Sequence, residues 1–65
     1  MVTLVTTNYK TEAEVITAWN SNKKFQIENA PFDSYFTKKD MKKYGVNSVY
    51  IIYGNKGQSV IISNN

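Results

Sequence analysis

Carboxylates are the candidates for a paired acid–base site in this sequence, because the chain contains no His and no Cys. Their absence removes the commonest general base, the thiol nucleophile and the usual ligands of zinc, copper and iron. A paired-carboxylate mechanism needs two acidic side chains held at one site. The chain has five candidates, at Glu12, Glu14, Glu28, Asp33 and Asp40.

The spacing of these carboxylates does not predict such a pair. Three of them fall at predicted helix starts, where negative charge is favoured by the helix dipole. Glu28 and Asp33 flank a proline, and nothing places them together. The glycines fall in predicted turns and form no phosphate-binding loop. We therefore expect no enzyme activity, no catalytic residue, no metal and no cofactor.

Lysines offer a different chemistry, which is contact with phosphate. The net charge is +3, and the basic side chains include no Arg. The most visible cluster contains Lys38, Lys39, Lys42 and Lys43. It fits either a nucleic-acid-contacting edge or the solvated face of a short helix. The lack of Arg favours the second, because Arg supplies the bidentate base contacts that Lys cannot make. Binding of nucleic acid remains the alternative hypothesis.

An aromatic cluster at Phe32, Tyr35 and Phe36 lies in the least regular segment of the sequence. Aromatic side chains on a loop can form the centre of a partner interface. They can equally close the open end of a thin core. The sequence does not separate these two interpretations.

Local signals predict the elements that position these residues. Residues 2–7 and 25–28 have strand patterns. The motif from Thr11 to Glu14 resembles a capping box and predicts a helix over residues 12–20, with Trp19 in the core. Thr37 and Gly45 bracket a second, short helix over residues 38–44. Residues 48–53 and 58–63 flank a glycine-containing turn and predict a β-hairpin.

These elements predict one small α+β domain over residues 1–65. The expected architecture has two layers, with the elements in the order β-α-β-α-β-β. One layer is a mostly antiparallel sheet of about four strands, and the main helix covers one face of it. The strand order is left open. The connection over residues 8–24 is long enough that the first two strands could run parallel.

Alternation along the hairpin predicts an apolar surface on both faces of the sheet. Val49, Ile51 and Tyr53 share one face, which we assign to the helix side beneath residues 15, 16 and 19. Tyr50 and Ile52 then point to the second face, and Ile61 joins them across the hairpin. The main helix can cover only one face. Either the segment over residues 32–44 wraps round to the second face, or that face meets another chain.

The sequence thus favours a small non-enzymatic interaction protein that binds another protein and self-associates as a homodimer. We expect Tyr50, Ile52 and Ile61 to form the interface, with the aromatic cluster as a second surface. Its size and its Asn-, Lys-, Ile- and Tyr-rich composition suit an inhibitor encoded by a phage or mobile element. The start of the chain lacks a signal-peptide pattern and no segment is apolar enough for a membrane span, which predicts a cytoplasmic protein without membrane contact.

Overall fold

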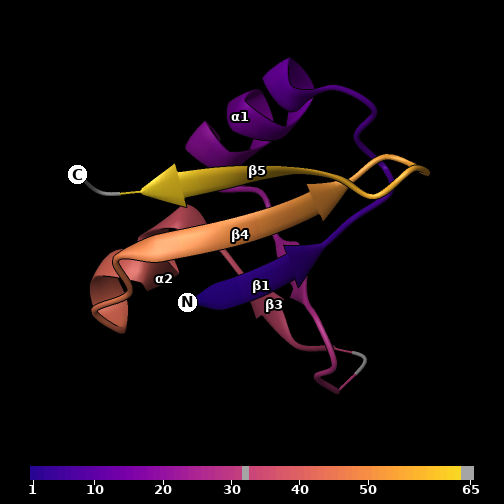
Figure 1. The fold of residues 1–65 in the computed structure, drawn as a ribbon. Coiled ribbons are helices and arrows are strands. Elements are labelled where there is room, and N and C mark those ends of the chain that lie inside the picture. Colours follow the sequence, from indigo (N-terminus) through magenta and orange to yellow (C-terminus); the bar gives the residue numbers. More distant parts are fainter. Residues whose placement is uncertain (32, 64–65) are drawn as a thin grey trace.

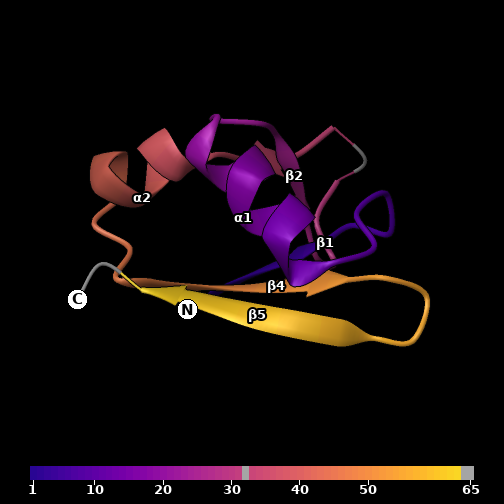
Figure 2. The ribbon, with the colours of Figure 1, turned by 90° about the horizontal axis from the view of Figure 1, so that it is seen from above.

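A five-stranded sheet and a layer of two helices make up the fold over the described residues, which are 1–31 and 33–63 of this computed structural model (Figures 1 and 2). The α+β class is confirmed. The sheet has one strand more than the predicted four, because residues 35–36 also pair. The elements are β1 (Val2–Val5), α1 (Glu12–Asn20), β2 (Phe25–Ile27), β3 (Tyr35–Phe36), α2 (Lys38–Lys43), β4 (Ser48–Tyr53) and β5 (Gln58–Ser63).

The strands lie in the order β3-β2-β1-β4-β5. Only β1 and β4 run parallel among these neighbours, and the other three pairs are antiparallel. The first two strands, for which a parallel pairing was left open, pair antiparallel. The chain between them returns to the carboxyl end of β1, where Gln26 pairs with Val5 and β2 runs back along its neighbour. The predicted hairpin is confirmed as β4 and β5.

Helix α1 has the predicted bounds, and side-chain and backbone bonds close both of its ends. The Thr11 hydroxyl accepts from the Glu14 N–H at 3.2 Å. The Glu14 carboxylate accepts from the Lys10 N–H at 3.4 Å rather than from Thr11, so the predicted capping box is displaced by one residue. At the other end Asn22 takes a φ of 58°, and the Lys23 N–H reaches the Ala18 carbonyl at 3.1 Å. This left-handed turn stops the helix.

Helix α2 is held at both ends by residues that the sequence identified. One carboxylate oxygen of Asp40 accepts from the Thr37 N–H at 2.9 Å and from its hydroxyl at 3.2 Å. Gly45 has a φ of 67°, and the Val46 N–H donates to the Met41 carbonyl at 2.8 Å. Glycine adopts this conformation without the strain that a Cβ brings. The helix ends one residue earlier than predicted.

Trp19 occupies the centre of the core, as predicted. Its ring lies 5.7 Å from that of Phe25 and 6.3 Å from that of Phe36. Ile16 does not share this position and is 39% exposed, because one helical step turns it about 100° from Val15. The expectation that Ile16 packs against the sheet together with Val15 and Trp19 is therefore wrong. The buried hydrophobic residues are Leu4, Val15, Ala18, Trp19, Phe25, Phe36, Met41, Val49, Ile51 and Tyr53.

The N-cap of α1 makes a testable contribution to stability. Replacing Thr11 with Ala removes the oxygen that accepts from the Glu14 N–H, at a cost of about 1 kcal/mol. In a domain this small, thermal denaturation followed by circular dichroism should show a fall in Tm of roughly 4–8 °C. Thr7→Ala is the matched control, since Thr7 is exposed before the helix and should change Tm little. Equal melting curves for the two variants would contradict the assigned cap.

Candidate functional site

Three of the five carboxylates lie in the helices, at Glu12 and Glu14 of α1 and at Asp40 of α2. Over residues 1–31 and 33–63, no group of three or more acidic side chains gathers in a way that could hold a metal ion. Asp40 is engaged in capping α2 through its bonds to Thr37. Neither described helix has the length and apolar character needed to cross a membrane. The candidate functional features that remain are the two surfaces described below.

Both described helices lie on the same side of the sheet, which Figure 2 shows from above. Met41 of α2 and Phe36 beside it are 2% and 5% exposed and belong to the same core as Trp19. One interpretation of the sequence required these residues to fold over the second face, and neither of them does. Phe32, which was included in that interpretation, lies outside the described residues. The second face is left without a covering element among the described ones.

We call this second face the open sheet face, and the strand register defines it. Tyr50 pairs with Ile61 on one side and with Thr3 on the other. Ile52 pairs with Val5 and with Ser59 in the next row. Paired residues point to the same face, and that face alternates with the one carrying Val49 and Ile51. Val5, Tyr50, Ile52 and Ile61 lie in adjacent rows and form the apolar patch of the open sheet face.

The predicted interface residues are therefore brought together. Ile61 is 60% exposed, while Tyr50 and Ile52 are half-buried between neighbouring strands. Val5 completes the patch, and sequence reasoning did not place it there. Its alternation within β1 was visible, but its position beside Ile52 depends on the parallel pairing of β1 with β4. No local signal predicts that pairing.

The aromatic cluster divides between the two faces of the sheet. Tyr35 pairs with Gln26, lies on the open sheet face and is 47% exposed. The Lys24 ammonium lies 5.8 Å from the centre of its ring. Phe36 pairs with Phe25 and points into the core, so it is no part of an exposed surface. A two-residue strand produces this split, because successive side chains point to opposite faces.

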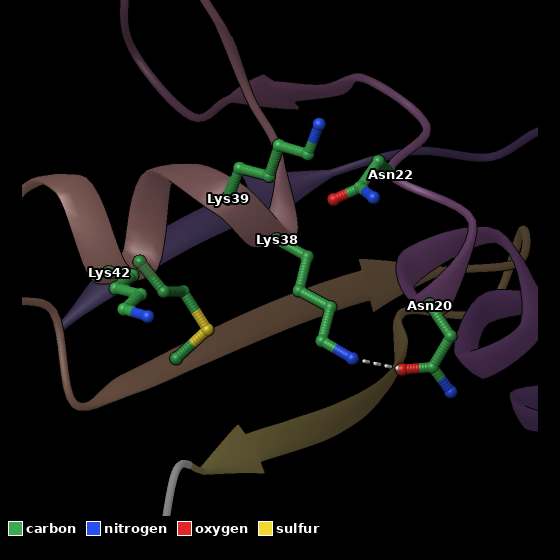
Figure 3. Close-up of a pocket in the computed structure, with 6 residues that line it drawn as sticks. Asn20, Asn22, Lys38, Lys39 and Lys42 are labelled. Atoms are coloured by element: carbon green, nitrogen blue, oxygen red, sulfur yellow. Dashed lines mark hydrogen bonds between the residues drawn. The ribbon is translucent and has the colours of Figure 1, made fainter.

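A second candidate surface is a groove between the carboxyl end of α1 and α2, shown in Figure 3. Its volume is about 470 Å³. The Lys38 ammonium donates to the Asn20 side-chain oxygen at 3.0 Å, which links the two helices across it. We call it the lysine groove. Its lining residues are Asn20, Asn22, Lys38, Lys39, Met41 and Lys42.

The lysine groove contains three of the four clustered lysines. Lys43 lies elsewhere, with its ammonium 5.2 Å from the centre of the Tyr44 ring. Sequence analysis missed Asn20 and Asn22, whose visible role was to end α1. Among the described residues, no carboxylate pairs with Lys38, Lys39 or Lys42. Ammonium groups that share a groove without a counter-charge attract anions.

Comparisons with known proteins leave both surfaces without a functional precedent. No protein-family model, no curated protein and no solved structure matches the chain. The chemistry of the two surfaces is therefore the basis for assigning a function.

Proposed function

We propose that this protein is a non-enzymatic interaction protein that binds another protein through the open sheet face. The observation that carries the proposal is the position of the helices. Both described helices pack on one side of the sheet (Figure 2). The strand register places Val5, Tyr50, Ile52 and Ile61 together on the other side. Contiguous exposed apolar surface is typical of binding sites rather than of surfaces that contact only water.

The composition of the open sheet face suits a protein partner. Complete burial of an exposed isoleucine is worth roughly 1.5–3 kcal/mol, so Ile61, which is 60% exposed, has more to gain from a partner than the half-buried Ile52. Tyrosine is enriched among the residues that dominate interface energies, and Tyr50 stands inside the patch. Thr3, Gln26 and Ser59 surround the apolar members in the strand register. An apolar centre with a polar rim is the usual organisation of a protein interface.

A hollow at one end of the open sheet face supplies polar contacts. Its volume is about 310 Å³, and Val5 and Tyr35 link it to the apolar patch. Hydroxyl, amide and ammonium groups in the hollow can orient a partner's side chain. The remaining lining residues are Thr6, Thr7, Asn8, Lys24 and Gln26.

Two finer versions belong to the same proposal. In one, the partner is a second copy of the chain and the protein is a homodimer. In the other, the protein is an inhibitor of a host protein, encoded by a phage or mobile element. The small size and the Asn-, Lys-, Ile- and Tyr-rich composition support the second version. A cytoplasmic location is compatible with both.

Changes on the two sides of the sheet test the proposal. The variant Ile52→Thr removes apolar surface from the open sheet face while keeping a β-branched side chain in β4. Ile16→Thr is the matched control, because Ile16 is an exposed isoleucine on the helix side. Immobilised protein should capture a partner from an extract of the source cells, and mass spectrometry then quantifies it. We expect capture to fall at least several-fold for Ile52→Thr and to persist for Ile16→Thr. Undiminished capture by a folded Ile52→Thr protein would contradict the proposal.

The lysine groove supports a second candidate function, which is binding of nucleic acid. Three lysines and two asparagines line one hollow between the helices, with Lys38 directed toward Asn20 (Figure 3). Such groups contact phosphate oxygens without reading the base sequence. We propose this function as the alternative, since the absence of Arg limits specific base recognition.

Salt dependence tests this alternative. Changing Lys38 and Lys42 to Gln should weaken binding to random-sequence DNA and lower the slope of log affinity against log salt by roughly 1.8. The control changes Lys10 and Lys56 to Gln, which alters the net charge equally outside the lysine groove. Fluorescence anisotropy at several salt concentrations measures both. Equal losses for the two double variants, or no binding by the unaltered protein at low salt, would rule the alternative out.

A further inference from the structure

Strand β5 forms an edge of the sheet, and its own sequence lacks the charged residues and proline that normally prevent edge strands from pairing. It is the last strand in the order, with β4 as its sheet neighbour among the described residues. The strand is six residues long and contains no charged side chain and no proline. The opposite edge, β3, has only two residues. Short length, charge and proline are the usual protections of an edge, and β5 has none of them.

The register shows which backbone groups of β5 point outward. The Ile52 carbonyl accepts from the Thr6 N–H at 2.8 Å, so the backbone of Ile52 faces the β1 side. Residues 49, 51 and 53 of β4 then face β5, because backbone groups alternate along a strand. Their partners at residues 62, 60 and 58 bond inward. The N–H and C=O of Ser59 and Ile61 therefore point away from the sheet.

The sequence of β5 is complementary to itself when reversed. Residues 59–63 read Ser-Val-Ile-Ile-Ser, which is symmetric in polarity about Ile61. An antiparallel copy centred there places Ile61 opposite its own equivalent and Val60 opposite Ile62. Ser59 of each copy then lies opposite Ser63 of the other. No charged side chain lies in this segment, so two copies can meet there although each chain carries a net charge of +3.

We infer that two copies of the chain pair antiparallel along β5 about a two-fold axis at Ile61. The two Ile61 residues then exchange N–H···O=C bonds, and two five-stranded sheets become one. A closed two-fold arrangement is the commonest form of homo-oligomer. In Figure 1, α1 extends past β5 in the layer behind the sheet and leaves the plane of the β5 strand itself open.

Edge pairing differs from the proposed function in the surface that it uses. It occupies the outer edge of β5 and leaves the open sheet face of each copy uncovered. The row of Thr3, Tyr50 and Ile61 continues across the axis into the same row of the second copy. The dimer therefore presents one open sheet face of twice the extent, and binding of a further protein does not compete with dimerisation.

Mass and amide exchange together test the inference. Size exclusion with light scattering at high micromolar concentration should give twice the mass of one chain. Hydrogen exchange followed by NMR should show slow exchange of the Ile61 N–H at this concentration and faster exchange on dilution. The Val60 and Ile62 amides bond within the chain and should remain slow throughout. A monomer mass with a rapidly exchanging Ile61 amide would overturn the inference.

Two substitutions at one position separate the backbone from the side chain. Ile61→Pro removes the outward N–H without breaking a bond to β4, and it should give a monomer. Ile61→Thr keeps the N–H and should remain a dimer. A dimeric Ile61→Pro protein would also overturn the inference, and the exchange measurement decides if that variant does not fold. Ile52→Thr should keep the dimer mass, since Ile52 lies outside the β5 edge. A monomeric Ile52→Thr protein would instead indicate a dimer through the open sheet face and would overturn edge pairing.

Discussion

One layer of helices can bury only one face of a sheet, and this limit governs the whole molecule. The chain has 65 residues, and a chain of this size buries roughly 60% of the surface that it exposes when unfolded. Its two described helices both pack on the side where Trp19 contacts Phe25 and Phe36. Strand alternation then places Tyr50 and Ile52 on the side without helices. The same geometry that completes the core thus leaves an apolar face in water.

The two candidate surfaces follow from different parts of this arrangement. The open sheet face is a consequence of strand alternation and lies on the side away from the helices. The lysine groove lies within the helix layer, where the carboxyl end of α1 meets α2 and Lys38 bonds to Asn20. A protein partner on one surface and an anion on the other would not compete. The proposals based on them can therefore be tested independently.

Signals local in sequence predicted much of the fold. Thr11 and Gly45 mark helix ends through their own side chain and φ angle, and the hairpin turn joins strands that are adjacent in sequence. Pairing of distant segments could not be predicted in this way. The neighbours of β1 depend on packing across the whole chain, so the place of Val5 beside Ile52 was missed. The lysine groove was missed in part for the same reason, because Asn20 and Lys38 come from different helices.

Exposure of the open sheet face in the isolated protein is the claim on which the account depends. The most direct measurement is the broadening of methyl NMR signals by a soluble nitroxide at low protein concentration, where no second copy covers the surface. Ile61 and Ile52 should broaden strongly, while Ile51, which is 0% exposed, should broaden little. Equal protection of Ile51, Ile52 and Ile61 would show that part of the chain folds over this face, and it would contradict the account.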